Sequence, residues 1–246
     1  MNKLECDGIV WYNTTKINFG GIIVNTKFSR ILFDYDGTLI IHDKANEGEQ
    51  IATILGLPKW QVAEFEARLT KYFSSGYTIY GKKVTYDHHY GNLERQMGPL
   101  EEFGITAKQL DDAITEKSIR CARLAQGAKE TLEYLASKGY QLCLFTNGFY
   151  KGQVENMKYK GIYEYFEKVY AWDNFYAKPD KRAFMRALGN TSAMNTVMIG
   201  DSLHADIIPA KQMGIYTVGI NLGTQDLTED RPDKVISNLS ELRQIL

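Results

Sequence analysis

The chain has 246 residues, of which 44% are hydrophobic and 24% are charged, and its formal net charge is -1. This length fits one large domain, or a core with a smaller second domain, and supplies enough apolar residues for a sizeable core. The near-neutral charge argues against a dedicated nucleic-acid-binding protein, which normally carries a basic surplus.

The N-terminal segment 1–29 has the composition of β-structure, and Gly20-Gly21 suits a hairpin turn. We expect an additional pair of strands here that packs on a sheet edge or on another subunit. The sequence leaves open whether the protein is a monomer or a homodimer.

The same N-terminal segment does not indicate secretion, because MNKLECDGIV has acidic residues where a signal peptide needs an apolar stretch. No run approaches the ~18 apolar residues of a membrane span. The three cysteines are widely spaced and form no zinc-binding pattern, so we expect reduced thiols. We therefore expect a cytoplasmic protein with no membrane partner.

From residue 30 onwards, short apolar runs resemble the buried strands of a parallel sheet. Helical patterns lie between them, for example at 128–139 and 178–189, and each of these two ends in glycine. Strands that alternate with helices predict an α/β protein with a doubly wound parallel sheet. The predicted strands are RILFDY, YQLCLFT, KVYA, TVMIG and IYTVGI.

Residues 43–125 interrupt this alternation, because they separate the first predicted strand from the second by far more than a crossover needs. Their apolar spacing is mostly helical, as in WQVAEFEARLTKYF. We therefore expect a core domain of residues 30–42 and 126–246, with a helical domain of residues 43–125 inserted into it. An insertion beside the carboxyl end of a strand is well placed to cover a site there.

The stretch ILFDYDGTLI contains two carboxylates, Asp34 and Asp36, in an otherwise apolar run. Buried acids are costly unless they are paired or bound to a cation, although Asp-Gly is also common in ordinary turns. The next predicted strand ends in Thr146, Asn147 and Gly148, which together offer a hydroxyl, an amide and backbone N–H groups to phosphate oxygens.

Two later loops complete a set of polar groups at strand ends. Lys178 precedes Pro179, and the strand TVMIG leads into an acidic loop with Asp201 and Asp206. Hard cations such as Mg²⁺ prefer oxygen ligands and usually take only a few carboxylates. Each feature alone is weak, but the four together, in this order, indicate one site.

The set D-x-D-G-T, T-N-G, K-P and G-D-S-x-x-x-D resembles the haloacid dehalogenase-like (HAD) hydrolase superfamily over residues 30 to 240. The resemblance implies a Rossmann-like core, and a helical cap after the first motif is common in that family. One departure is Pro209, where the family usually has Gly. Either the helix there begins late, with Pro209 in its first turn, or it bends.

The resemblance also implies roles for the matched residues. Asp34 would be the nucleophile that forms an aspartyl-phosphate, and Asp36 would protonate the leaving oxygen and then activate water. Thr146 and Lys178 would hold the phosphoryl group, with help from the backbone around Asn147 and Gly148. Magnesium would be bound by Asp34, the backbone carbonyl of Asp36, and Asp201, with Asp206 as a further ligand or as a partner of Lys178.

The leading functional hypothesis is therefore a Mg²⁺-dependent phosphomonoester hydrolase that acts on a small phosphorylated metabolite. The segment GDSLHADI, with His204, resembles nucleotidase-like members and slightly favours a nucleoside monophosphate, while sugar phosphates and phosphoglycolate stay open. The alternatives are a phosphomutase such as a β-phosphoglucomutase-like enzyme, a 2-haloacid dehalogenase, and a catalytically silent regulatory binding protein. Haloacid dehalogenases lack an acid at the position of Asp36.

Aromatic residues are frequent between positions 72 and 90, and Lys82 and Lys83 lie among them. We favour the interpretation that they form the packed interior of a small helical domain, because aromatics dominate core burial. A surface that stacks on a flat ring of the substrate is the alternative. The aromatic residues concerned are Tyr72, Phe73, Tyr77, Tyr80, Tyr86 and Tyr90.

Overall fold

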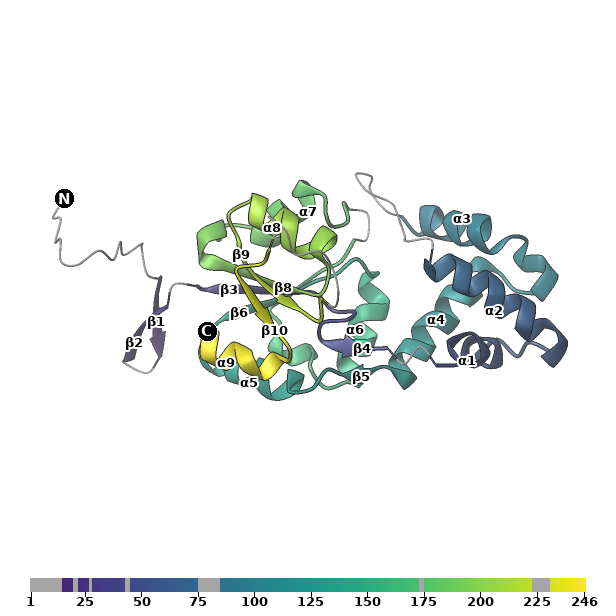
Figure 1. The fold of residues 1–246 in the computed structure, drawn as a ribbon, viewed down its shortest axis with the longest axis horizontal. Helices are drawn as coiled ribbons and strands as arrows, with labels where there is room; N and C mark the ends of the chain where they lie inside the picture. Colours follow the sequence, from purple (N-terminus) through teal and green to yellow (C-terminus); the bar gives the residue numbers. More distant parts are fainter. Residues whose placement is uncertain are drawn as a thin grey trace.

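The structure is a computed structural model that describes residues 15–19, 22–26, 28–42, 45–74, 85–172, 175–222 and 231–246. Its centre is a six-stranded sheet in the order β10-β9-β8-β3-β6-β7, in which all neighbouring strands described are parallel (Figure 1). This is the predicted doubly wound α/β fold. The strands are β3 (Arg30–Phe33), β6 (Gln141–Phe145), β7 (Lys168–Tyr170), β8 (Thr196–Gly200), β9 (Tyr216–Ile220) and β10 (Lys234–Ile236).

The sheet is buried by helices on both faces, and the alternation of side chains along β3 decides which residue meets which layer. Ile31 and Phe33 belong to the apolar cluster on the face of α5 (Ala128–Ser137), α6 (Tyr150–Tyr159) and α9 (Leu242–Ile245). Leu32 belongs to the cluster on the opposite face, with α7 (Lys181–Leu188) and α8 (Ile208–Gln212). Burial on both faces explains why β3 reads as a continuous apolar run.

Strand β3 lies in the middle of the sheet, and the sheet extends from it on both sides. Strands β6 and β7 extend the sheet on one side, and β8, β9 and β10 extend it on the other. In open α/β sheets, ligands bind outside the carboxyl ends of the strands, where the strand order reverses. The carboxyl end of β3 is therefore where a site is expected.

In the described part of the chain, four α-helices follow β3 before the chain returns to the sheet: α1 (Glu47–Ile54), α2 (Lys59–Ser74), α3 (Tyr86–Met97) and α4 (Ala107–Cys121). They enclose an apolar cluster of their own, which includes Ile51, Phe65 and Leu110, and they lie to one side of the sheet (Figure 1). The chain leaves and re-enters the sheet region through a short antiparallel pair, β4 (Ile40–Ile41) with β5 (Arg123–Leu124). The division into core and cap domains stays a prediction, which this separate cluster supports.

Strands β1 (Thr15–Phe19) and β2 (Ile22–Thr26) form an antiparallel pair. Gly20 and Gly21, the expected turn, lie outside the described residues. The pair lies apart from the six-stranded sheet (Figure 1). Its packing on a sheet edge or on another subunit stays a prediction.

The segment after β8 explains Pro209. Residues Leu203–Ile207 form a turn of π-helix, and α8 then begins at Ile208, with Pro209 in its first turn. A proline is tolerated there because the N–H that it lacks has no partner within the helix. The helix thus begins late, and Asp206 lies on the π-helical turn that precedes it.

None of the helices in the described part of the chain is both long enough and apolar enough to span a membrane.

Candidate active site

The predicted site residues follow four neighbouring strands at the carboxyl edge of the sheet. Asp34 comes directly after β3, Thr146 after β6 and Asp201 after β8, while Lys178 lies in the loop between β7 and α7. Backbone pairing continues past the strands, since the N–H of Asp34 donates to the carbonyl of Ile199 at 2.9 Å. These side chains are therefore positioned by the sheet itself.

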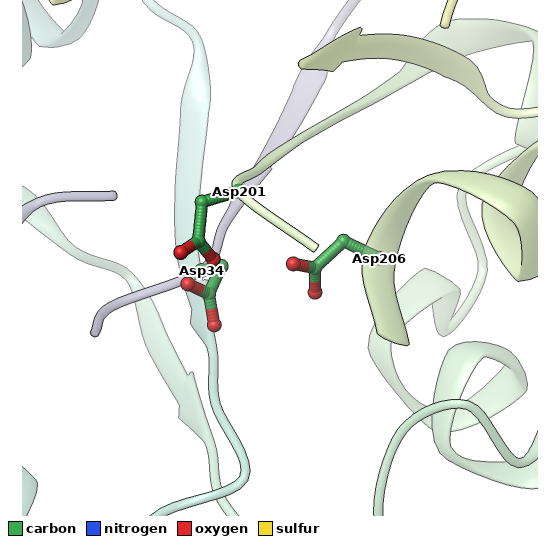
Figure 2. Close-up of side chains that lie close together, drawn as sticks. All are labelled: Asp34, Asp201 and Asp206. Carbon is green, nitrogen blue, oxygen red and sulfur yellow. The ribbon is translucent and has the colours of Figure 1, made fainter. Parts of the chain in front are cut away.

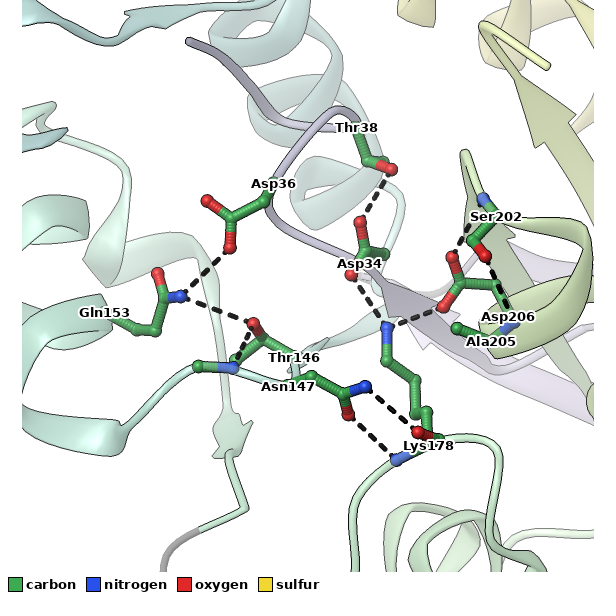
Figure 3. A network of polar contacts seen from close by, with 11 residues as sticks. Asp34, Asp36, Thr38, Thr146, Asn147, Gln153, Lys178, Ser202, Ala205 and Asp206 are labelled. Carbon is green, nitrogen blue, oxygen red and sulfur yellow. Dashed lines mark hydrogen bonds and ion pairs between the residues drawn. The ribbon is translucent and has the colours of Figure 1, made fainter. Parts of the chain in front are cut away.

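Lys178 is the centre of a buried ionic network (Figure 3). Its ammonium donates to Asp34 Oδ1 at 2.7 Å and to Asp206 Oδ1 at 2.6 Å. Thr38 Oγ1 donates to the other oxygen of Asp34 at 2.9 Å, and the backbone N–H of Ser202 donates to the other oxygen of Asp206 at 3.2 Å. Both carboxylates are thus held on each oxygen, which fixes their orientation.

Three carboxylates converge at this point, since oxygens of Asp34, Asp201 and Asp206 all lie within 4.8 Å of one another (Figure 2). Burial raises the pKa of Asp201 to about 6, and the nearby charge of Asp34 adds to the increase. Burial also raises the pKa of Asp206, while the Lys178 ammonium counteracts this. One ammonium therefore balances only part of the negative charge of three acids.

The pKa of Lys178 shows that the ammonium persists. Burial lowers this pKa, but the charges of Asp206 and Asp34 outweigh the effect and raise it above its ordinary value. Lys178 therefore stays protonated.

Gly37 leaves room for one of these acids. Its φ is +86°, a value that L side chains rarely adopt, and a Cβ at this position would lie 2.0 Å from Asp201 Oδ2. The glycine of D-x-D-G-T is thus needed both for the turn after β3 and for the close approach of the Asp201 carboxylate.

Asp36 has a different environment from Asp34 although only one residue separates them. Its side chain is 47% exposed and points away from Lys178 (Figure 3). One carboxylate oxygen contacts His42 Nε2 at 2.7 Å, and the other accepts a hydrogen bond from Gln153 Nε2 at 3.1 Å. Asp34 therefore belongs to the buried network, while Asp36 lies at its solvent-facing rim.

Thr146, Asn147 and Gly148 form the loop after β6. Asn147 exchanges two hydrogen bonds with the backbone of Lys178, at 3.0 and 2.8 Å, and so fixes the lysine loop. The N–H of Gly148 donates to Thr146 Oγ1 at 3.0 Å. The loop after β6 and the lysine loop therefore lie side by side, as their motifs predicted. Asn147 holds the backbone of Lys178 in place, which is a role that the sequence did not reveal.

Two residues in contact with the site were not identified from the sequence, namely His42 and Gln153. Neither belongs to a motif, and each reaches Asp36 only through the fold. The only sequence signal was helical spacing after T-N-G, which places residues 149 and 153 on one face of a helix.

A cavity of about 1140 Å³ opens beside Asp36 and Gly148, between helices α3 and α4 on one side and α6 on the other. Part of its wall is aromatic. Tyr86 of α3 stacks on Phe149 with ring centroids 4.3 Å apart, and His89 and Trp172 also contact Phe149. Tyr77, Tyr80, Lys82 and Lys83 lie outside the described residues, whereas Tyr72 packs against the apolar cluster of the four helices.

The carboxyl edge of this parallel sheet carries a buried lysine and a cluster of acids. These are groups that phosphoryl transfer can use, because it needs positioning and charge stabilisation and a carboxylate can serve as a covalent nucleophile. Residues 28–214 match the family model described as haloacid dehalogenase-like hydrolase. The chain belongs to this family.

Relatives agree with this assignment, and a solved structure has a similar fold. The chain is 28% identical to a phosphoglycolate phosphatase of Vibrio parahaemolyticus, over 88% of this chain and 95% of that protein. It is 25% identical to the pyrimidine 5'-nucleotidase YjjG of Escherichia coli, over 89% of this chain and 98% of that protein. The fold resembles the putative HAD-hydrolase YfnB of Bacillus subtilis bound to magnesium, with a TM-score of 0.67, 22% identity, and coverage of 90% and 99%.

Proposed function

We propose that this protein is a Mg²⁺-dependent phosphomonoester hydrolase that acts through an aspartyl-phosphate on Asp34. The observation that carries the proposal is the buried contact of Asp34 with Lys178 beside two further acids, with the exposed Asp36 next to it. Phosphoryl transfer mainly requires positioning and charge stabilisation, and this arrangement supplies both. The proposed substrate is a small phosphorylated metabolite.

The donor set fits Mg²⁺, which prefers carboxylate and carbonyl oxygens. Asp34 and Asp201, together with the backbone carbonyl of Asp36, would hold the ion, and Asp206 would either join them or remain the partner of Lys178. The raised pKa of Asp201 supports a cation here, because burial with too little positive charge disfavours its ionised form. When bound, the ion reduces the repulsion between an anionic nucleophile and an anionic phosphate.

The residues divide the reaction between them. Asp34 attacks phosphorus, and the bond from phosphorus to the leaving oxygen breaks while Asp36 gives that oxygen a proton. Asp36 then takes a proton from the water that hydrolyses the acyl phosphate and restores Asp34. Lys178 and Thr146 stabilise the negative charge on the transferring group.

The alternatives fit the site less well. A haloacid dehalogenase releases halide and needs no proton donor at position 36, where this chain has an acid. A phosphomutase uses the same chemistry and is separated by whether phosphate is released to water. A catalytically silent binding protein would have no need to retain Asp34, Asp36, Thr146 and Lys178 together.

The purified protein is expected to release inorganic phosphate from one or more members of a phosphomonoester panel. Addition of EDTA should abolish this release. Excess Mg²⁺ should restore it, because the cation then balances the negative charge of the three acids and of the phosphate. Phosphate release is measured with a colorimetric assay, and calcium serves as a control for a divalent ion of different size. Transfer of phosphate between sugar positions without release to water would favour a mutase.

We propose that the cavity beside Asp36 binds the leaving group of the substrate. We favour a leaving group that carries a flat ring. Of the five basic residues that line it within the described chain, four have carboxylate partners: His42, His89, Lys108 and Arg120. Among the described residues, Lys151 is the one basic side chain of this cavity that has no carboxylate partner, so a carboxylate-bearing leaving group such as glycolate finds little to bind. The aromatic wall instead suits a nucleoside monophosphate.

Replacement of Tyr86 by Leu tests this preference. Base stacking on an aromatic ring is worth ~1–3 kcal/mol, so KM for a pyrimidine nucleoside monophosphate should rise about tenfold. KM for the ringless glycerol phosphate should stay unchanged. The matched control is Trp60→Leu, which removes a 79% exposed ring of α2 that does not line the cavity. Equal effects on both substrates would speak against ring recognition.

We also propose the domain boundaries and the cellular location. The separate apolar cluster of α1–α4 and the β4–β5 pair support a cap of residues 43–125 on a core of residues 30–42 and 126–246. We propose a cytoplasmic protein with no nucleic-acid partner, and a state of monomer or homodimer.

A further inference from the structure

Gln153, in the first turn of α6, reaches two residues of the site at once. Its Nε2 lies 3.1 Å from Asp36 Oδ2 and 3.4 Å from Thr146 Oγ1 (Figure 3). It therefore joins the proposed acid–base residue to the loop after β6, which the sheet holds in place. Among the described residues of α6, Gln153 is the one that donates a hydrogen bond to Asp36.

The backbone beneath Gln153 is shaped to let it lie there. A Cβ on Gly148 would fall 1.9 Å from Gln153 Nε2 and within 2.8 Å of its Cγ. Gly148 has no left-handed φ in this structure, so its lack of a side chain matters for space rather than for the turn. The amide thus crosses the loop at a place that only a glycine leaves free.

The position of the Asp36 side chain depends on such a contact, because this side chain is half exposed and its hydrogen bonds within the described structure go to His42 and Gln153 rather than to Lys178. Apart from His42 on the other oxygen, Gln153 is the side chain found to hold it in the described structure. A neutral amide can donate to a carboxylate through its nitrogen and accept from a carboxylic acid through its oxygen. It can therefore hold Asp36 in both protonation states of the cycle.

We propose that Gln153 is a positioning residue that aims the Asp36 carboxyl group at the leaving oxygen of the substrate. This inference rests on the proposed function, in which Asp36 gives a proton to the leaving oxygen while the bond from phosphorus to that oxygen breaks. Gln153 itself gains and loses no proton. Without the Gln153 amide, the Asp36 carboxyl group can rotate away from the substrate. Its proton is then less often aligned with the leaving oxygen when the bond to phosphorus breaks.

The test uses the dependence of rate on the leaving group. An alkyl phosphate such as glycerol phosphate needs the proton, because an alkoxide is a poor leaving group, whereas para-nitrophenyl phosphate hardly needs it. In Gln153→Met, which keeps the length of the side chain and removes the amide, kcat/KM for glycerol phosphate should fall about tenfold or more. For para-nitrophenyl phosphate it should stay within about threefold.

The ratio kcat/KM is chosen because it covers the steps up to departure of the leaving group. If Asp36 also activates water less well, hydrolysis of the acyl phosphate slows, and Gln153→Met should show a burst of para-nitrophenolate before its steady rate. A variant that only disturbs folding or phosphate binding lowers both values of kcat/KM together and shows no such burst.

The matched control is Lys158→Met, further along α6, an exposed residue that does not line the cavity and whose ammonium lies over the ring of Tyr163. It should change both substrates by the same factor. An equal loss for both esters in Gln153→Met, or no loss for either, overturns the inference while leaving the proposed function intact. A wild-type protein that releases phosphate from no member of the phosphomonoester panel contradicts the proposed function, and the inference with it.

Discussion

Replacement of Asp34 by Asn is expected to abolish phosphate release, with a loss of kcat of at least about 10³-fold, because an amide cannot form the covalent intermediate. The change preserves the size of the side chain, and the fold should tolerate it because Thr38 and Lys178 remain beside it. Phosphate release and thermal unfolding are measured together. A stable but inactive variant is the expected outcome.

A covalent readout makes this expectation sharper. Rapid acid quench of the wild-type protein during turnover, followed by mass spectrometry, should detect one added phosphoryl group on the peptide that contains Asp34. The variant should show none. The matched control is Asp87→Asn, an exposed acid in the first turn of α3. Undiminished activity of Asp34→Asn would mean that another group is the nucleophile.

Replacement of Lys178 by Met is expected to affect both stability and activity. The Lys178 side chain is 2% exposed and its ammonium lies between two carboxylates, so its removal leaves buried negative charge without a partner. Loss of one partner of a buried pair typically costs ~3–5 kcal/mol of unfolding free energy. Activity should fall as well, because the phosphoryl group loses its cation. Urea unfolding and phosphate release measure the two effects.

A double variant separates the ionic cause from a packing defect. Lys178→Met combined with Asp206→Asn removes the lysine and one of the two carboxylates that it leaves unpaired, and should regain part of the lost stability. Lys108→Met, which breaks an exposed ion pair with Asp112 on α4, should leave the unfolding midpoint almost unchanged. A double variant that is less stable than Lys178→Met would contradict the ionic explanation.

Much of the site could be predicted because its residues stand next to buried strands. The apolar runs before Asp34, Thr146 and Asp201 mark strand ends, and parallel strands bring their carboxyl ends to one edge. The hydrophobic pattern thus predicted which residues lie together, and the types and spacing of the polar residues predicted the chemistry of the site. Strand β10 (Lys234–Ile236) was not predicted, because two of its three residues are exposed and it has no apolar run.

Other features required the three-dimensional structure. His42 and Gln153 lie 6 and 117 residues from Asp36 in the sequence, and neither carries a motif. Helical spacing could place Gln153 on a face of α6, but it could not say what that face would meet. The role of Asn147 was likewise hidden, because its partner is the backbone of Lys178, which a sequence pattern does not identify.

The sequence by itself determined the class of fold, the inserted helices and the order of the acids, the hydroxyl and the lysine around the sheet edge. These follow from local patterns, since hydrophobic periodicity and the chemistry of single residues are written along the chain. Only the tertiary structure decided which acid is buried beside Lys178 and which is exposed to the cavity. Asp34 and Asp36 are chemically identical side chains, and their difference arises from burial and from contacts with distant residues.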